Sequence, residues 1–238
     1  HNERGQRDFQ LTDDVERPHD RRHDPGWLIG KDATPNYDRV FPQDAVTRID
    51  ITISAANWKI MQDAFLDGYH IQYAHPNTAA KVIHTNVMAF EDFGRHCRFI
   101  APRKSIDRWL EEDPGDTNLD PYVTETHFLL PNSTLLRQPD HFQLLTFRPH
   151  PTDPTRSRME QRLMVPRLAD SGMAEDHWNN RWEKNWNILL AVLHNEDFPM
   201  LRNSQRGMGS ADAGDMLLGR NEVANHVFRR ETKKLLAE

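Results

Sequence analysis

Two histidines, His70 and His75, lie five positions apart in a segment that also carries two acids, Asp63 and Asp67. Neutral imidazole nitrogens suit borderline ions such as Fe(II) and Zn(II), so the pair could supply two ligands of a metal site. On a regular helix, side chains four residues apart share a face, whereas a spacing of five turns the second ring by about 140°. The rings can face one ion only if the helix unwinds or bulges, and Gly68 and Pro76 favour such a break.

Three groups of motifs, in the same order along the chain, resemble a known family. The first is Asn57-Trp58-Lys59, followed by Asp67-Gly68-Tyr69-His70 and His75-Pro76. It resembles the iron-site helix of the ring-hydroxylating oxygenases, more specifically the catalytic domain of Rieske non-haem iron oxygenase alpha subunits. The later matches are residues 193–199 with 205–208, and residues 218–222 with Phe228. The resemblance covers about residues 46–238, and three ordered motifs are far more specific than a histidine pair.

The resemblance implies roles for two acids. In the family the third iron ligand is a carboxylate on a long helix near the C-terminus, and Asp197 falls at that position, with Glu196 as the neighbouring alternative. Two histidines and one carboxylate leave open positions on the ion for oxygen and water. Asp67 matches the family's catalytic acid, which links the ligand histidine to a cluster-ligand histidine of a neighbouring subunit. A carboxylate there can also fix the tautomer of the histidine.

The resemblance also implies the chemistry. We expect an oxygenase catalytic domain that activates O2 at a mononuclear Fe(II) held by His70, His75 and Asp197. It would hydroxylate, dihydroxylate or demethylate a mostly apolar or aromatic substrate. Electrons would come from a [2Fe–2S] Rieske cluster, supplied in turn by a ferredoxin or reductase. The family's head-to-tail ring predicts a homotrimer.

Cysteine content limits what this chain can bind. Cys97 is the only cysteine among 238 residues, so the chain has neither an internal disulfide nor the two cysteines and two histidines of a Rieske cluster. The sequence starts at His1 rather than Met. We therefore expect the cluster domain upstream in a parent chain or on another polypeptide.

Composition argues against two classes of partner. A formal charge of −6 argues against nucleic acid. No apolar run approaches the roughly 18 residues of a membrane span, and no signal peptide is visible. We expect a cytoplasmic protein.

Two other functions fit the same residues. A metal-dependent hydrolase could use the His-His-Asp set on Zn(II), with a bound water as the nucleophile. A non-catalytic small-molecule binding module could share the architecture, although such a module has no need for three convergent ligands. One departure from the family is Asp63, where many members carry Asn. It adds a possible extra carboxylate near the metal.

Sequence periodicity predicts the elements that hold these residues. Residues 1–45, rich in Asp, Arg, His and Pro, read as an extended arm or linker. Alternating apolar residues predict strands at 45–54, 81–90, 95–101, 122–130, 134–138, 142–148 and 158–166. We expect a surface loop at 111–120 and a hairpin turn at Pro139-Asp140.

The C-terminal part changes to helical periodicity. Trp178, Trp182 and Trp186 recur at helical spacing within residues 175–205, which predicts a long helix with tryptophans in the core. A loop at 211–219 and a final helix at 222–236 follow. These elements make an α+β domain. The resemblance implies an antiparallel sheet wrapped around the long C-terminal helix, the helix-grip arrangement of START and Bet v1-like proteins, with residues 46–238 as the mononuclear iron catalytic domain.

Overall fold

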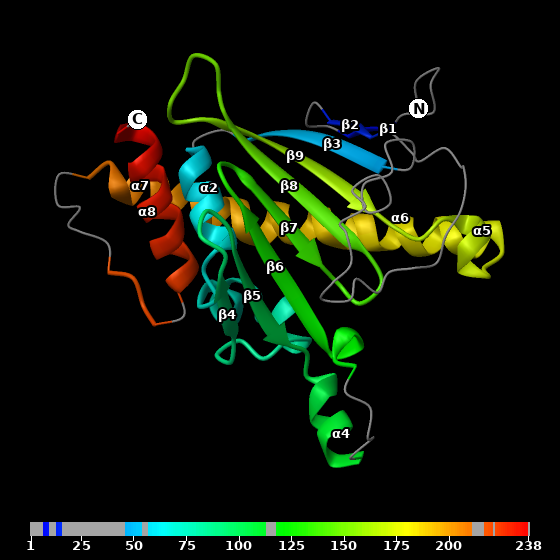
Figure 1. Ribbon diagram of the computed structural model, residues 1–238. Helices are drawn as coiled ribbons and strands as arrows, with labels where there is room; N and C mark the ends of the chain where they lie inside the picture. Colours follow the sequence, from blue (N-terminus) through cyan, green and yellow to red (C-terminus); the bar gives the residue numbers. More distant parts are fainter. Residues whose placement is uncertain are drawn as a thin grey trace.

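A seven-stranded antiparallel sheet lies at the centre of the molecule, with strand order β3-β9-β8-β7-β6-β5-β4 (Figure 1). The computed structural model describes residues 7–9, 13–15, 46–53, 57–112, 118–210, 217–220 and 222–237. The strands of the sheet are β3 (Val46–Ile53), β4 (Ala89–Asp92), β5 (Cys97–Pro102), β6 (Val123–Leu129), β7 (Ser133–Arg137), β8 (Phe142–Pro149) and β9 (Ser157–Met164). Two short strands near the N-terminus, β1 (Arg7–Phe9) and β2 (Asp13–Val15), pair with each other.

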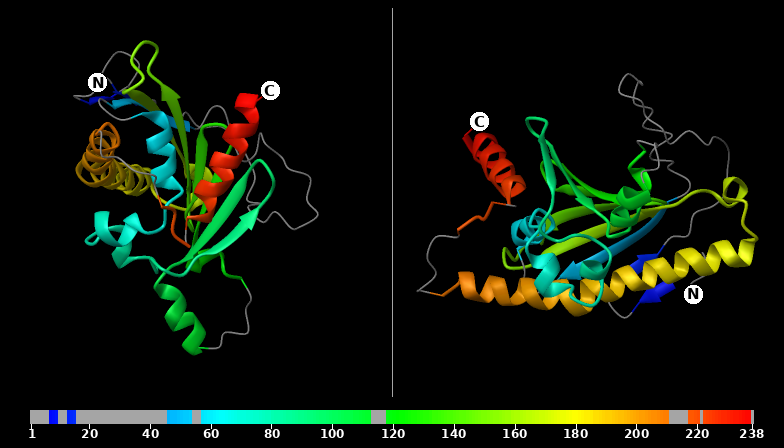
Figure 2. Two further views of the ribbon diagram at one scale, coloured as in Figure 1. Left: turned by 90° about the vertical axis from the view of Figure 1, so that its left-hand side faces the viewer. Right: turned by 90° about the horizontal axis from the view of Figure 1, so that it is seen from below.

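One face of the sheet is covered by a long helical rod (Figure 2). The rod consists of α6 (Glu175–Val192), a π-helical turn η3 (Leu193–Asp197) and α7 (Phe198–Met208). The other helices are α2 (Trp58–Phe65), α3 (His70–Ala74), α4 (Ser105–Glu112), α5 (Leu168–Ser171) and α8 (Val223–Ala237). Two single-turn helices, η1 (Ala79–Lys81) and η2 (Asp120–Tyr122), complete the described elements.

Alternation along the strands explains why the rod packs where it does. In β8 every second residue is buried, including Leu145 and Phe147, and these pair with Gln161 and Met159 of β9. Successive strand side chains point to opposite faces, so the apolar set gathers on one face. Those residues form a core cluster with Trp186 of α6 and with residues of α2, η3 and α7.

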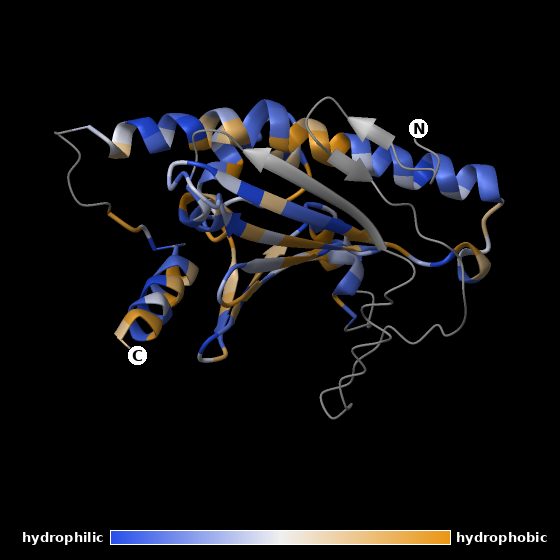
Figure 3. Ribbon diagram, turned by 90° about the horizontal axis from the view of Figure 1, so that it is seen from above, coloured by the Kyte–Doolittle hydropathy of each residue, from blue (hydrophilic) through white to orange (hydrophobic). Residues whose placement is uncertain are grey.

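A second core cluster joins α8 to the opposite end of the sheet. Phe228 and Val227 of α8 pack with Phe128 of β6 and Cys97 of β5. Leu66, which follows α2, belongs to the same cluster. Both clusters therefore hold α2 and its end, directly before the segment that contains the histidine pair. In Figure 3, α8 has hydrophobic and hydrophilic sides, whereas most of α6 is hydrophilic on the side shown.

The predicted α+β class and the long C-terminal helix are confirmed. The tryptophan interpretation holds for Trp182 and Trp186, which are buried, and Trp178 is half-buried. The strand predicted at 81–90 is wrong over most of its length, because η1 and an isolated bridge at Ile83 precede β4, which begins at Ala89. The loop predicted at 111–120 starts with the last residues of α4.

Some predictions fall outside the described residues. They include most of the arm at 1–45, the middle of the loop at 111–120, and residues 211–216 of the C-terminal loop. Within the part of the chain that is described, no helix combines the length and apolar character needed to cross a membrane.

Candidate metal centre

The predicted helix is interrupted directly before the first histidine, at a stretch that contains Gly68. The side chain of Asn57 caps α2 by accepting a hydrogen bond from the Lys59 N–H (2.9 Å), and α3 starts at His70 after four non-helical residues. Within the break, a Cβ on Gly68 would lie 2.7 Å from the sulfur of Met88. A side chain at Gly68 would thus collide with Met88, and glycine permits the close approach.

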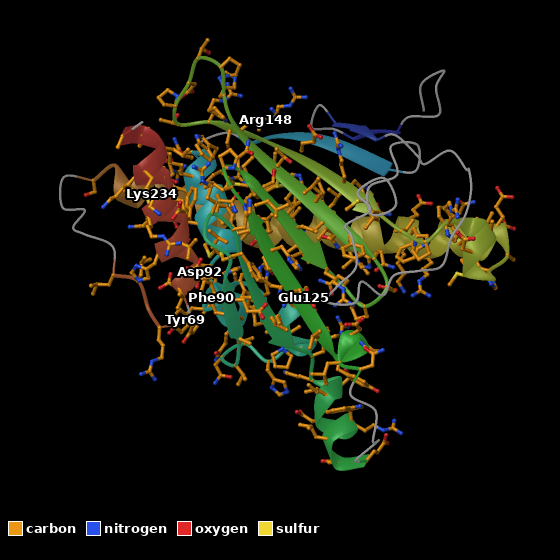
Figure 4. All side chains as sticks on the ribbon, viewed as in Figure 1. Tyr69, Phe90, Asp92, Glu125, Arg148 and Lys234 are labelled. Carbon is orange, nitrogen blue, oxygen red and sulfur yellow. The ribbon has the colours of Figure 1, made fainter. Side chains whose placement is uncertain are left out.

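The next residue, Tyr69, connects the break to the C-terminal segment. Its ring packs on Gly219 and leaves no room for a Cβ there. In Figure 4, Tyr69 lies near the start of α8. Gly219, which belongs to one of the family-like motifs, therefore contacts the turn directly before His70. The structure thus places this motif against the turn that leads into the metal site.

His70, His75 and Asp197 come together as a group that could hold a metal ion. Their ligand atoms all lie within 4.8 Å of one another. Asp197 Oδ1 lies 3.2 Å from His75 Nε2 and 3.8 Å from His70 Nε2. Adjacent ligands about 2.1 Å from one ion are roughly 3–3.5 Å apart, so a small inward movement would complete coordination. The residue types and spacing therefore fit a two-histidine, one-carboxylate site.

A π-helical turn places the carboxylate. Within the rod, the N–H of Phe198 bonds to the carbonyl of Leu193, five residues earlier. The following Pro199 has no N–H and would clash with a regular preceding turn, which favours the wider turn. Single π turns inside α-helices are frequent at functional sites. Here the turn contains Asp197, which is 5% exposed.

His70 is oriented by the main chain of Asp67. Its Nδ1 lies 2.7 Å from the Asp67 carbonyl oxygen, which can only accept, so Nδ1 carries the proton and Nε2 has a free lone pair. The carboxylate of Asp67 instead accepts hydrogen bonds from the N–H groups of Tyr69 (2.6 Å) and His70 (3.2 Å). It caps α3 and remains 3.7 Å from the ring nitrogen. The main-chain carbonyl of Asp67, and not its carboxylate, thus fixes the tautomer of His70.

His75 is oriented by a side chain that the sequence suggested only as an alternative ligand. Glu196 Oε2 lies 2.6 Å from His75 Nδ1, on the far side of the ring from Asp197. The Thr78 hydroxyl donates to the same oxygen at 2.7 Å. Glu196 therefore faces away from the common ligand position. Because adjacent residues on a helical turn point in different directions, the sequence could have indicated that Glu196 and Asp197 do not both face the ion. No spacing rule identified Thr78.

The two histidines differ in their electrostatics. Burial lowers the pKa of His70, and the nearby charge of Asp197 opposes this shift without cancelling it. Burial also acts to lower the pKa of His75, but hydrogen bonds and charges of Asp197 and Glu196 outweigh it and hold that pKa above its usual value. A metal must displace any proton on Nε2, so binding at His75 is expected to weaken in acid.

Asp63 lies outside the metal-ligand group. Its nearest charged partner is Arg229 of α8, at 3.9 Å from Oδ2. Among the described residues, Oδ1 of Asp63 is buried and has no hydrogen-bond partner. Burial raises the pKa of Asp63 to about 6, and Arg229 opposes this shift. The extra carboxylate thus faces the α2–α8 contact.

Similar proteins place this geometry in a family. Residues 27–238 match the family described as ring hydroxylating alpha subunit (catalytic domain). Among solved structures, a quaternary ammonium Rieske monooxygenase, CntA, bound to L-carnitine is 15% identical, with a TM-score of 0.52 over 85% of this chain and 56% of that chain. Dicamba monooxygenase bound to 3,6-dichlorosalicylic acid is 14% identical, with a TM-score of 0.56 over 86% and 64%. No curated protein is similar enough in sequence to match.

The structural likenesses concern the fold, since the identities are low. The chain spans 56% and 64% of the lengths of these two chains. The family match, by contrast, covers most of this chain and includes both histidines and Asp197. This chain belongs to the ring-hydroxylating oxygenase alpha subunit family, as a catalytic domain of the family's oxygenases.

Proposed function

We propose that this domain activates O2 at a mononuclear Fe(II) held by His70, His75 and Asp197, and that it oxidises an organic substrate beside the iron. The observation that carries the proposal is the convergence of these three side chains, within 4.8 Å, in a chain of an oxygenase family. The family implies non-haem iron, and the donor set suits Fe(II) with open positions. Bound iron would supply the O2 chemistry.

The residues around the triad would prepare the site for that chemistry. The tautomers held by the Asp67 carbonyl and by Glu196 leave both Nε2 lone pairs directed at the ion. Leu193 and Phe198, which flank Asp197 in the rod, are 2% and 3% exposed. We propose a mostly apolar or aromatic substrate, as the resemblance of the motifs to the family implies.

We further propose that electrons arrive through Asp67 from a [2Fe–2S] Rieske cluster outside this sequence. Asp67 has a half-buried carboxylate, 22% exposed, next to His70, whose side chain is 13% exposed. A cluster-ligand histidine of a neighbouring subunit could therefore reach the acid from solvent. This arrangement needs a head-to-tail ring, so the proposed assembly is a homotrimer, with a ferredoxin or reductase as the electron source. Hydroxylation, dihydroxylation and demethylation are all compatible with the site.

Metal content tests the proposal. The full chain and its His70→Ala, His75→Ala and Asp197→Ala variants would be loaded with Fe(II) without oxygen, desalted, and assayed for iron. We expect about one iron per wild-type chain and almost none in each variant, because two protein ligands hold an ion poorly. His84→Ala is the control, since His84 pairs with Asp107 on the surface (3.0 Å) and should leave iron unchanged.

Full iron retention in Asp197→Ala would overturn the ligand assignment. The zinc hydrolase remains the second candidate because zinc accepts the same donors. Elemental analysis of protein purified without added metal separates the two: iron supports the oxygenase, whereas zinc with ester or amide hydrolysis supports the hydrolase.

A further inference from the structure

The two histidines of the triad are held by acceptors of different charge. His70 donates its Nδ1–H to a neutral main-chain carbonyl at 2.7 Å, whereas His75 donates to the carboxylate of Glu196 at 2.6 Å. A carboxylate partner raises the basicity of an imidazole more than a carbonyl does, because proton transfer toward it leaves the ring with more negative charge. The two rings are therefore unequal donors to any ion bound at Nε2.

Consecutive acids of the π turn contact both nitrogens of one ring. Asp197 Oδ1 lies 3.2 Å from His75 Nε2, while Glu196 Oε2 lies 2.6 Å from Nδ1 of the same imidazole. The ring is thus held between two neighbouring residues of η3. His75 itself is 5% exposed, so the surrounding packing limits its rotation further.

Thr78 completes this arrangement from the segment after Pro76. Its hydroxyl donates to Glu196 Oε2 at 2.7 Å, so one oxygen accepts from both the threonine and the histidine. An ionised carboxylate can only accept hydrogen bonds, so the proton shared between Glu196 and His75 lies on Nδ1 of the histidine. Thr78 also keeps Glu196 on the outer side of the ring, away from the ligand position.

We propose that Glu196 and Thr78 are positioning residues that hold His75 in the Nδ1–H tautomer and make it the stronger imidazole donor of the metal centre. The inference rests on the proposed function only in taking His70, His75 and Asp197 as ligands. It applies to a bound Fe(II), Co(II) or Zn(II) alike. Neither residue touches the ion.

Cobalt binding to the full apo chain tests the proposal without turnover. Co(II) affinity would be measured by chelator competition, and the visible absorption bands of the bound ion would be recorded. We expect Glu196→Gln, which keeps the size but removes the charge, to weaken affinity about 10–100-fold, as loss of such outer partners does. The bands should move to longer wavelength because a weaker donor lowers the ligand field.

Thr78 offers a matched pair of variants. Thr78→Val removes the hydroxyl at nearly constant shape and should weaken affinity several-fold, in the same spectral direction as Glu196→Gln. Thr78→Ser keeps the hydroxyl and should restore affinity and spectrum. Glu111→Gln, at an exposed acid of α4, controls for the change in net charge and should match wild type.

Two results would overturn the proposal. One is a Glu196→Gln protein with wild-type affinity and spectrum; the other is a Thr78→Val protein that differs from Thr78→Ser only in thermal stability. If His75→Ala also binds Co(II) like wild type, the triad itself is wrong and the proposed function fails. If His75→Ala loses the ion while Glu196→Gln and Thr78→Val keep it unchanged, only the positioning roles fail.

Discussion

Three acids close to the histidine pair have three different surroundings. Asp197 faces both Nε2 atoms, Glu196 holds the outer nitrogen of His75, and Asp67 caps α3 through hydrogen bonds to main-chain N–H groups. Each carboxylate is within a few residues of a histidine or of another acid, yet only Asp197 points at the shared ligand position. The direction of each side chain, more than its place in the sequence, separates ligand from support.

Asp67 gives the first residue-scale prediction. Asp67→Ala should keep most of its iron, because the His70 ring is oriented by the Asp67 main-chain carbonyl, which the substitution retains. Loss of the carboxylate removes two capping hydrogen bonds and the proposed electron route, so turnover with a Rieske donor should fall by about 100-fold or more. Iron content and substrate oxidation would be measured together. Unchanged coupled turnover would remove the proposed role of Asp67.

Asp63 gives a prediction about stability and pH. Its pKa in the fold is about 6, against 3.8 for the ordinary group, so folding favours the protonated form. The raised pKa contributes up to about 3 kcal/mol to the free energy of unfolding. This contribution is fully present below about pH 4 and is lost as the pH rises through 6. Asp63→Asn cannot ionise and should exceed wild type in stability at pH 7.5, but hardly at pH 4.

Urea unfolding of both proteins at the two pH values measures this difference. Glu111→Gln, at an exposed acid, is the control and should follow wild type at both. Equal midpoints for Asp63→Asn and wild type at pH 7.5 would mean that the Asp63 carboxylate is solvated or fully paired with Arg229.

At the scale of elements, two irregularities build the site. α3 ends at Ala74 and His75 departs from helical geometry (φ −116°, ψ 40°), which lets histidines five positions apart bring their rings to a centroid distance of 5.1 Å. The π turn in the rod brings Asp197 to them. Regular helices in both places would direct these side chains apart. Pro76, directly after His75, and Pro199, directly after Phe198, each disfavour a regular helix across the preceding residues.

Gly68 gives the prediction at this scale. Gly68→Ala places a Cβ 2.7 Å from Met88 Sδ, and moving the thioether should lower stability by about 1 kcal/mol. The double variant Gly68→Ala/Met88→Ala should remove the collision, so the alanine at 68 should cost less in that background. Gly207→Ala is the matched control: its Cβ meets nothing within 4 Å in α7, and it should stabilise by roughly 0.5–1 kcal/mol. Thermal unfolding of apo protein compares these three variants, and Met88→Ala alone, with wild type. A Gly68→Ala variant as stable as wild type would show that Met88 moves freely.

At the scale of the whole molecule, the sheet connects the site to both ends of the domain. The core cluster shared by α2, β8, β9 and the rod lies on one side of the histidine segment, and the cluster under α8 lies on the other. The broken helix is therefore fixed between two packed regions, which suits a site that must hold three ligands within a few tenths of an ångström.

The chain as a whole should bind iron but no cluster. Its only cysteine, Cys97, is 1% exposed, and burial raises the pKa of its thiol to about 12. A Rieske centre needs two cysteine and two histidine ligands. We expect iron-loaded protein to contain about one iron and no acid-labile sulfide per chain. Stoichiometric sulfide with a Rieske-type absorption spectrum would contradict this expectation.

Local patterns predicted much of the molecule. The helix–strands–helices order, the tryptophan stripe and the break near Gly68 follow from periodicity and from glycine and proline chemistry, which act over a few residues. The motifs around His70, His75 and Asp197 marked the ligand set because the residue types and their order resemble a family. The strand prediction at 81–90 was wrong over most of its length, because short apolar runs resemble strands whether or not a neighbouring strand is available to pair with them.

Only the tertiary structure shows which acid faces the ion and which acids support the histidines. Glu196 and His75 are 121 positions apart, and Thr78 reaches Glu196 across 118, so no local pattern could pair them. Asp63 turned toward α8 because the α2–α8 contact, which joins residues far apart in sequence, determines the direction of that side chain. The sequence by itself indicated the histidine pair. The carboxylate that orients His75 could be identified only from the tertiary structure, because it depends on where the rod crosses the broken helix.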